Sequence, residues 1–307
     1  MHLMIPFAGT VSEAGRHALQ TLALPRLDQL LARLQPTQRL GSDEFSLNPP
    51  HEQALAAAWG WPSGPDEALP LAARQAAALG LDGQQPWGLL TPVHLHVGTE
   101  QVSLTPPAGL QLDEAGSRAV LEAVRPLFET EGFSLRYAAP LQWLATHALF
   151  DGLATASLDR VTGRNVDRWL PDHRSARLIR RLQNEVQMLL YTHPLNDQRE
   201  AAGLPTVNSV WLSGCGPLPA HTVSADLQLD DRLRAPALGE DWAAWCEAWR
   251  ALDAGPLQAL AGAGDDARLT LCGERFAQTF APAPRGLWQR LAGRWRQGSA
   301  LAVLEAL

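Results

Sequence analysis

A short polar segment over residues 192–216, THPLNDQREAAGLPTVNSVWLSGCG, collects side chains that can bind a ligand. His193, Asn196 and Arg199 supply an imidazole, an amide and a guanidinium close together in the chain. A guanidinium can hold two oxygens of a phosphate or carboxylate at once. The same residue types also cap helices and satisfy backbone groups. The residue types alone therefore leave ligand binding and helix capping equally open.

Two further polar stretches could contribute to a site. The segment SLDRVTGRN carries Asp159, Arg164 and Asn165, and a salt-bridged surface loop is the other interpretation of it. His94 and His96 in the segment HLH would lie on one face of a strand. Such a pair can ligate a metal, but no third ligand follows at a known spacing, and we expect no metal site there.

Candidate nucleophiles are weak in this chain. Ser42 in GSDEF is a candidate for catalysis, although a serine before an acidic pair more commonly caps a helix. Cys215 stands between two glycines and could act as a thiolate, but no helix is predicted to begin there. A buried cysteine at the end of a strand is the expected outcome.

The composition excludes several mechanisms. The chain has 307 residues, 46% hydrophobic and 19% charged, as expected of a globular protein. All 25 basic residues are Arg, because the sequence contains no Lys. A Walker A lysine, a Schiff-base lysine and a lysine general base are thus excluded. Recognition of an anion would have to use Arg, His or backbone N–H groups.

Charge and cysteine content also restrict the partners and the compartment. A net charge of −7 disfavours general binding to nucleic acid, which depends on cationic contacts to phosphates. No apolar run approaches the roughly 18 residues of a membrane span, and the N-terminus lacks the features of a secretion signal. The three cysteines form no CxxC pair, which fits a reducing compartment. We therefore expect a cytoplasmic protein that binds neither nucleic acid nor membrane.

The hydrophobic pattern predicts an α/β fold, with a core sheet flanked by helices and an inserted α+β domain. We expect the core domain to comprise residues 1–87 and 208–307, and the inserted domain residues 88–207. Trp242, Trp245 and Trp249 recur at helical spacing and predict a core-facing stripe. The predicted helices span residues 24–34, 51–61, 69–81, 113–132, 175–193, 240–252 and 285–307, and the predicted strands lie within 2–9, 87–104, 133–146, 208–214 and 267–273.

The polar segment also resembles one found in archaeal-type, cofactor-independent phosphoglycerate mutases. Those enzymes read roughly H-P-V-N, then R, then G-L-x-x-A-N, an apolar strand and G-x-G. The segment LPRLDQLLARL is similar to their T-P-N-L-D-x-L, and GSDEF faintly resembles the stretch that carries their nucleophile. The residues in step with the first pattern are His193, Pro194, Asn196, Arg199, Gly203, Asn208, Gly214 and Gly216.

The resemblance implies the alkaline phosphatase superfamily, a core sheet with an inserted substrate domain, and chemistry that needs two divalent metals. The family holds these metals with an Asp-Gly after the first strand and an Asp-His after a late strand, among other residues. This chain instead reads Phe7-Ala8-Gly9 and Gly273-Glu274-Arg275 at those places. Without ligands the metals could not activate a nucleophile, and Ser42 would be a bystander. No cofactor is therefore expected, unless the chain is an active enzyme with two divalent ions.

The nearest group of this kind is the bacterial regulatory proteins of the RpfE type. The resemblance implies a catalytically degenerate, mutase-like protein that binds a small anionic metabolite in a regulatory role. The polar segment would then face the ligand, with His193, Asn196, Arg199, Arg164, Asn165, Asp159, His94 and His96 as candidate binding residues. An active metal-dependent phosphotransferase or phosphoglycerate mutase is the first alternative. An interaction protein without a small-molecule site is the second.

Overall fold

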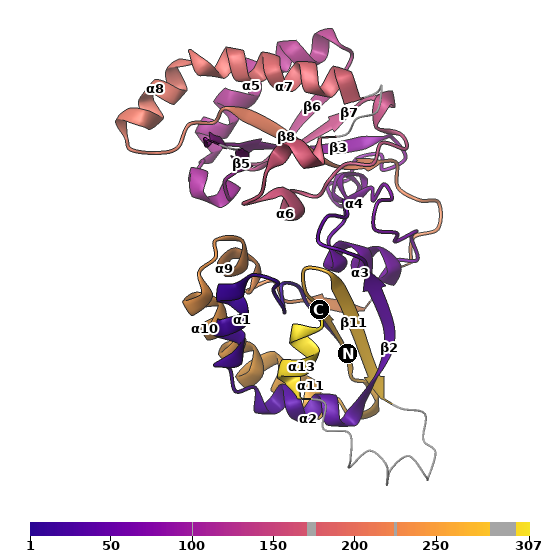
Figure 1. The fold of residues 1–307 in the computed structure, drawn as a ribbon. Coiled ribbons are helices and arrows are strands. Elements are labelled where there is room, and N and C mark those ends of the chain that lie inside the picture. Colours follow the sequence, from indigo (N-terminus) through magenta and orange to yellow (C-terminus); the bar gives the residue numbers. More distant parts are fainter. Residues whose placement is uncertain (100, 171–175, 224–225, 283–298) are drawn as a thin grey trace. The chain divides into compact units, whose positions relative to one another are not determined.

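A computed structural model describes residues 1–99, 101–170, 176–223, 226–282 and 299–307. The chain forms two compact units (Figure 1): the first comprises Met1–Pro65 and Val223–Leu307, and the second comprises Asp66–Thr222. The sequence predicted boundaries after residue 87 and before residue 208, whereas the structure divides the chain after Pro65 and after Thr222. The second unit takes in two further elements, α4 (Leu71–Ala78) and β8 (Ser209–Gly216), because α4 packs on its sheet and β8 is a strand of that sheet.

The first unit is built on a five-stranded sheet in the order β2-β11-β10-β1-β9. β1 runs parallel to β9 and β10, whereas β11 is antiparallel to both β10 and β2. Side chains alternate between the two faces of a strand, so Leu3 and Ile5 point to one face and His2 and Met4 to the other. The strands are β1 (His2–Ile5), β2 (Leu34–Gly41), β9 (Leu227–Leu229), β10 (Arg268–Cys272) and β11 (Phe276–Pro282).

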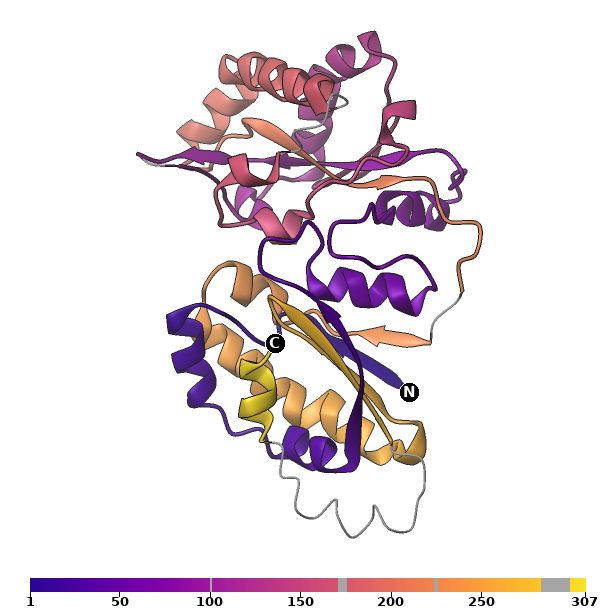
Figure 2. The ribbon, with the colours of Figure 1, turned by 45° about the vertical axis from the view of Figure 1, so that its right-hand side comes forward.

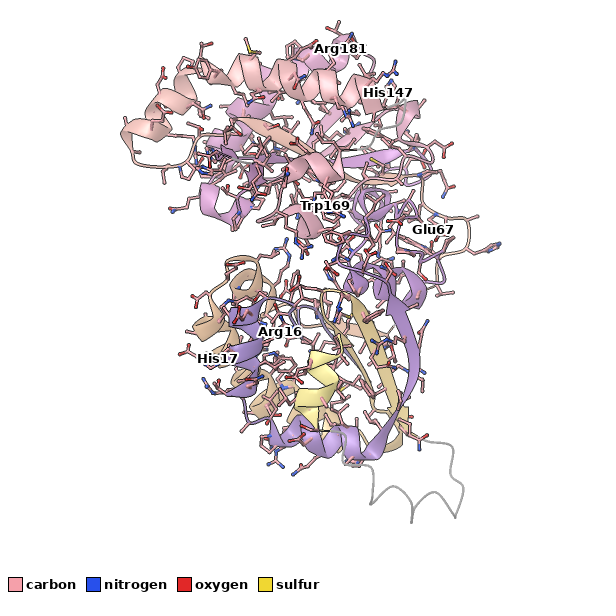
Figure 3. All side chains as sticks on the ribbon, viewed as in Figure 1. Arg16, His17, Glu67, His147, Trp169 and Arg181 are labelled. Carbon is pink, nitrogen blue, oxygen red and sulfur yellow. The ribbon has the colours of Figure 1, made fainter. Side chains whose placement is uncertain are left out.

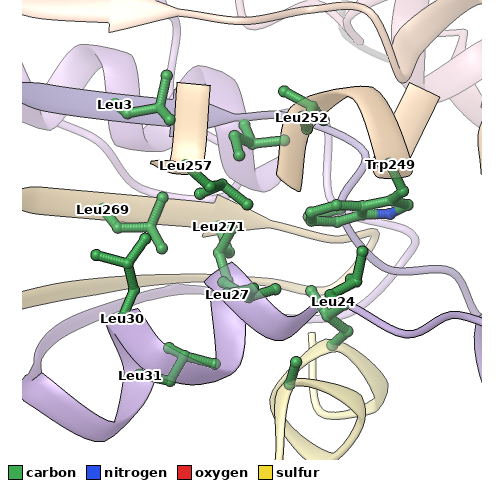
Figure 4. Close-up of a cluster of buried hydrophobic side chains, with 14 of the residues drawn as sticks. Leu3, Leu24, Leu27, Leu30, Leu31, Trp249, Leu252, Leu257, Leu269 and Leu271 are labelled. Carbon is green, nitrogen blue, oxygen red and sulfur yellow. The ribbon is translucent and has the colours of Figure 1, made fainter. Parts of the chain in front are cut away.

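Most helices of the first unit cover the face to which Leu3 and Ile5 point (Figures 1 and 2). Their apolar side chains, including that of Trp249, form a core with Leu3 and Ile5 of the sheet, and Figure 4 shows part of this core. Trp245 and Trp249 are fully buried, so the predicted tryptophan stripe belongs to the core. The helices on this face are α1 (Glu13–Gln20), α2 (Pro25–Arg33), α9 (Arg234–Leu238), α10 (Trp242–Leu252), α11 (Gln258–Gly262) and α13 (Ala300–Glu305).

The helix ends in this unit follow from local sequence. α2 begins at Pro25, whose fixed φ suits the first helical turn. Its next two N–H groups, of Arg26 and Leu27, donate to the carboxylate of Asp253 at 3.2 and 2.9 Å. α1 begins after Ser12, whose hydroxyl accepts from the N–H of Gly15 at 3.0 Å. Arg16 and His17 stand on the exposed side of α1 (Figure 3).

The second unit contains an antiparallel four-stranded sheet in the order β6-β7-β3-β8. α5 and α7 pack on one face, around Trp143, Leu90 and Leu212, and α4 packs on the other around Trp87 and Leu144. A two-stranded hairpin, β4 with β5, follows β3. These elements are β3 (Trp87–Val93), β4 (Leu95–Val97), β5 (Val102–Leu104), α5 (Glu114–Thr130), β6 (Ser134–Ala139), β7 (Gln142–Thr146) and α7 (Ala176–Tyr191).

Short helices complete the second unit. The segment SLDRVTGRN, for which a surface loop was one interpretation, contains α6 (Leu158–Val161), and η3 (Val166–Trp169) directly follows it. Two further short helices, η1 (Pro107–Leu110) and η2 (Ala148–Phe150), lie in other connections. A further helix, α8 (Pro194–Ala201), was not predicted and lies within the polar segment. Pro194 ends α7 and occupies the first position of the next helix.

The mixed α/β class expected from the sequence is confirmed. Several elements were not predicted, among them the helices α1 and α8 and the strands β2, β9 and β11. The predicted C-terminal helical region is described only from residue 299 onward, where α13 lies, and residues 285–298 of that prediction are outside the described residues. No helix within the described ranges is long and apolar enough to cross a membrane.

Candidate functional site

The turns that leave β1 and β10 lie at one edge of the first sheet, because these strands are parallel neighbours. In open α/β sheets this edge, at the carboxyl ends of the strands, is the usual place for a ligand. The turns are Phe7-Ala8-Gly9 and Gly273-Glu274-Arg275, the places where the resemblance puts metal ligands. The backbone joins them directly, since the N–H of Ala8 donates to the carbonyl of Cys272 at 2.7 Å.

The carboxylate in the second turn is tied to the first part of the chain. Oε1 of Glu274 accepts hydrogen bonds from the hydroxyl of Thr10 and the N–H of Val11, both at 2.9 Å. Phe7 has a positive φ of 58°, which a non-glycine residue rarely adopts. Its carbonyl accepts from the indole N–H of Trp245 at 3.0 Å, and this bond holds the strained turn in place.

The last residues of the chain pack against the same two turns. A side chain at Gly9 would collide with the carbonyl of Leu304, and one at Gly273 would come within 2.6 Å of Cβ of Leu307. The N–H groups of Arg275 and Phe276 donate to the carbonyl of Leu307 at 2.9 and 2.7 Å. The space between the turns is thus filled by the chain itself.

These residues do not fit a two-metal centre. Glu274 is the only acid of the two turns, and one of its oxygens already accepts two hydrogen bonds. A pair of divalent ions needs several oxygen or nitrogen ligands held in an open arrangement. The turns offer Phe7, Ala8, Gly9 and Gly273 instead.

Ser42, the weak candidate nucleophile, directly follows the end of β2. Gly41 pairs with Phe276 of β11, so Ser42 lies beside the same sheet edge. Ser42 is partly buried and caps no helix. The neighbouring Asp43 caps a turn, since its Oδ1 accepts from the N–H of Phe45 at 2.8 Å.

The polar segment of the second unit is a structural junction. His193 caps α8, and its Nδ1 accepts from the N–H of Leu195 at 3.2 Å. Asn196 is 5% exposed. Its amide donates to the carbonyls of Leu190 and Val207, both at 2.8 Å, and its Oδ1 accepts from the N–H of Val207 at 2.9 Å. Asn196 therefore joins the end of α7 to the chain that enters β8.

Arg199 joins a second pair of segments. Its Nε donates to the carbonyl of Pro205 at 2.8 Å, and a terminal nitrogen donates to the carbonyl of Leu110 at the end of η1. The side chain is buried, and this burial lowers the pKa of the guanidinium, an effect partly opposed by Asp113. Arg199 is thus bonded to backbone carbonyls rather than to an acid.

The two histidines of the HLH segment have different surroundings. Strand β3 ends at Val93 and β4 begins at Leu95, so His94 occupies the break between them. Nδ1 of His94 lies 2.9 Å from the carbonyl of Thr206, which joins it to the polar segment. His96 is exposed on β4.

The remaining candidates lie near the β4–β5 hairpin or on α6. Asn165 forms an isolated bridge with Ser103 of β5 and caps η3 by accepting from the N–H of Asp167 at 3.1 Å. Arg164 precedes it and is half-buried, and Asp159 lies on α6. These contacts place His94 and Asn165 on elements that adjoin one hairpin, while Asn196 and Arg199 direct their polar atoms into backbone.

A groove in the first unit holds polar residues that the sequence analysis did not select. It has a volume of about 680 Å³ and lies on the face of the sheet to which His2 and Met4 point. Nε2 of His2 is 2.8 Å from the hydroxyl of Thr270, which is in turn 2.8 Å from that of Thr279. Burial lowers the pKa of His2 to about 4, with further contributions from Arg268 and the N-terminal ammonium. The alternation of HLMI and RLTL places these polar residues on one face of each strand, but only the pairing of the two strands brings them together.

Cys215 is buried at the end of β8, as expected. Burial raises the pKa of its thiol to about 12, an effect partly opposed by a hydrogen bond with Thr155. A thiol in this state is a poor nucleophile, because the thiolate is the reactive form.

Comparison with known proteins finds likeness only among solved structures. No family model and no curated protein matches the chain. The structure of PH0037 protein from Pyrococcus horikoshii is 11% identical, covers 92% of this chain and 87% of that chain, and gives a TM-score of 0.47. A cofactor-independent phosphoglycerate mutase from Thermoplasma acidophilum is 13% identical, covers 92% of this chain and 90% of its own, and gives a TM-score of 0.37.

Proposed function

We propose that this chain is a catalytically degenerate, phosphoglycerate-mutase-like protein that acts by binding a small metabolite in a regulatory role. The observation that carries the proposal is the filled edge of the first sheet. Glu274 is bonded to Thr10 and Val11, and Leu304 and Leu307 pack against the glycines of the two turns. A substrate phosphate and its metals would need the space that these residues occupy.

The regulatory part of the proposal follows from the resemblance to the RpfE-type proteins together with this filled edge. A protein that keeps a substrate-type architecture without an open catalytic edge can respond to a metabolite without consuming it. The buried free thiols Cys215, Cys246 and Cys272 support a reducing, cytoplasmic location.

Binding of an anion by the polar segment of the second unit is not favoured by the geometry. The amide of Asn196 and the Nε of Arg199 are directed to carbonyls of their own unit. Recruiting Arg199 to a ligand would leave buried carbonyls without a donor, at a cost of about 1–3 kcal/mol for each group. A ligand site elsewhere in the chain is therefore the better proposal.

A turnover assay tests the proposal directly. The conversion of 3-phosphoglycerate to 2-phosphoglycerate would be followed with manganese added, beside the hydrolysis of a chromogenic phosphate ester. We expect no rate above that of a Ser42→Ala variant, which serves as the matched control. Elemental analysis of protein purified without chelator should find no stoichiometric manganese or zinc.

A different result would favour the active-enzyme alternative. Turnover in the ordinary enzyme range of about 1–10³ s⁻¹ that disappears in Ser42→Ala would overturn the proposal. Two tightly bound equivalents of a divalent metal would also overturn the proposal, because a catalytically degenerate protein with a filled sheet edge has no site for them there.

A further inference from the structure

One face of the first sheet is divided into an apolar half and a polar half. α3 (Pro50–Ala58) covers the apolar half, where Met4, Cys272 and Ala277 pack against Ala54. A helix of nine residues is only about 14 Å long, so it cannot cover strands along their whole length. The polar half, toward the start of β1 and β10, is left to the groove.

The register of the strands explains how the polar side chains meet. His2 pairs with Arg268, Met4 with Thr270, and Thr270 with Thr279, so these side chains form neighbouring rows on one face. Gln38 of β2 extends the row, because it pairs with Thr279. The groove therefore has a floor of hydroxyl, imidazole and amide groups from four strands.

Several of these groups keep free hydrogen-bonding capacity. Thr270 is 1% exposed and is satisfied by His2 and Thr279. In contrast, the guanidinium of Arg268 and the amide of Gln38 have no side-chain partner within the described ranges. Nδ1 of His2 likewise has none there, since its only hydrogen bond uses Nε2.

Positively and negatively charged groups both line the groove. Burial first, and then the Arg268 guanidinium and the N-terminal ammonium, lower the pKa of His2, and no carboxylate contributes to that shift. Asp226 and Asp266 also line the groove, and their carboxylates have no cationic partner among the described residues. The floor near His2 is consequently the positive part of the groove.

We propose that this groove is a binding site for a small organic anion that carries hydroxyl groups, with its carboxylate or phosphate on Arg268 and the N–H at Nδ1 of His2. The hydroxyl groups of the ligand would be received by Thr279, Gln38 and the carboxylate of Asp266. The volume of about 680 Å³ is ample for such a molecule. This assignment deepens the proposed function, since it gives the proposed metabolite a place and a chemical class.

Calorimetric titration of the full chain would test the site with defined probes. D-glycerate and glycerol 3-phosphate carry an anion and hydroxyl groups, glycerol lacks the anion, and inorganic phosphate lacks the carbon chain. We expect saturable binding of the two organic anions, weaker binding of phosphate and none of glycerol up to about 10 mM, a concentration that detects even millimolar affinity. Turnover is followed separately, so that loss of binding and appearance of catalysis are distinguished.

Three variants locate the binding. Arg268→Gln should weaken the affinity for the organic anions at least tenfold, because a charge-assisted hydrogen bond is lost. Asp226→Asn should leave that affinity unchanged or strengthen it, since it removes a like charge. Arg136→Gln is the matched control, because Arg136 is an exposed arginine on β6 of the second unit, and it should change nothing.

The outcomes separate the proposal from its competitors. Absence of binding by every probe would overturn it, as would equal affinities for wild type and Arg268→Gln. Binding of glycerol as tightly as D-glycerate would overturn the anionic class of the ligand. None of these results bears on the filled sheet edge or on the outcome of the turnover assay, whereas turnover would refute the proposed function even if binding at Arg268 were confirmed.

Discussion

The guanidinium of Arg199 donates a hydrogen bond to the carbonyl of Leu110, 89 residues earlier in the chain. A second bond, from Nε to the carbonyl of Pro205, spans only six residues. One side chain thus fixes η1 to α8 and to the chain that leads into β8. Arg199, the residue that the sequence most strongly suggested for anion binding, therefore has a structural role in the second unit.

Arg199→Ala should therefore destabilise the protein. The change leaves the carbonyls of Leu110 and Pro205 without this donor, and an unsatisfied buried polar group costs about 1–3 kcal/mol. We expect a loss of about 2–4 kcal/mol in the free energy of unfolding, measured by urea denaturation. Arg136→Ala should cost less than about 0.5 kcal/mol, since Arg136 is exposed.

The opposite pattern would restore the original hypothesis for the segment. If Arg199→Ala kept its unfolding free energy but lost the binding of D-glycerate, then Arg199 would be a ligand-binding residue. A double change with Asn196→Ala would also distinguish the two roles, because both residues fasten the same junction and their effects should not add.

Two tryptophans of α10 provide a matched comparison. The indole N–H of Trp245 donates to the carbonyl of Phe7 at 3.0 Å, whereas the buried indole nitrogen of Trp249 has no hydrogen-bond partner among the residues that the structure describes. Both side chains are fully buried. Trp245→Phe should therefore lower the free energy of unfolding by about 1–3 kcal/mol more than Trp249→Phe, because only the first leaves an acceptor unpaired.

Thermal and urea unfolding of the two variants would measure this difference. Replacement of either residue by Ala should cost about 3–5 kcal/mol, as for other buried aromatic side chains, and a loss of this size would agree with their place in the core. Equal losses for the two Phe variants would show that the bond to Phe7 contributes nothing, and that the positive φ of Phe7 is held by other contacts.

The buried thiols lead to a prediction on reactivity. Cys215, Cys246 and Cys272 are all buried, and burial raises the pKa of Cys215 to about 12 and that of Cys272 as well. We expect none of the three to react rapidly with Ellman's reagent in the native protein at pH 8, and all three to react in denaturant. Fast native reaction that is lost in Cys215→Ser would revive the nucleophile interpretation of the Gly-Cys-Gly segment.

Local patterns predicted those elements whose own residues decide their state. The largely apolar segment over residues 2–9 predicted β1, and the helical spacing of Leu27, Leu30 and Leu31 predicted α2. β2 was missed because five consecutive residues after Leu34 are exposed, so its strand state depends on pairing with β11 and not on an apolar pattern. The limits of the two units also depend on such distant pairing, which no local pattern contains.

The candidate site shows the same division. Sequence patterns found His193 and Asn196 as polar residues at a helix end, and Asn196 proves to be bonded to residues before and after it. Nothing in the local sequence of Arg199 indicates that Leu110 lies beside it. The groove was missed because His2 and Thr270 are isolated polar residues in apolar strands, and only their register brings them together.

His2 should make the stability of the first unit sensitive to acid in a defined range. Burial first, and then Arg268 and the N-terminal ammonium, depress the pKa of His2 from 6.5 to about 4. As the pH falls from 6.5 to about 4, the imidazole of His2 becomes protonated in the unfolded chain but stays neutral in the folded chain. The free energy of unfolding therefore decreases. Above pH 6.5 both states hold neutral imidazole, and His2 then contributes no pH dependence.

His2→Gln removes this titration and keeps a group that can bond to the hydroxyl of Thr270. We expect the melting temperatures of wild type and variant to differ by a constant amount above pH 6.5. Between pH 6.5 and about 4, the melting temperature of wild type should fall steadily relative to that of the variant. Asp226 and Asp266 line the same groove in both proteins, so their effect largely cancels in the comparison. A bound organic anion should make the loss of stability between pH 6.5 and about 4 smaller, because it favours the protonated imidazole of His2. A temperature difference that stays constant over the whole range would mean that His2 is solvated like an ordinary surface histidine, and that the floor of the groove is open to bulk water.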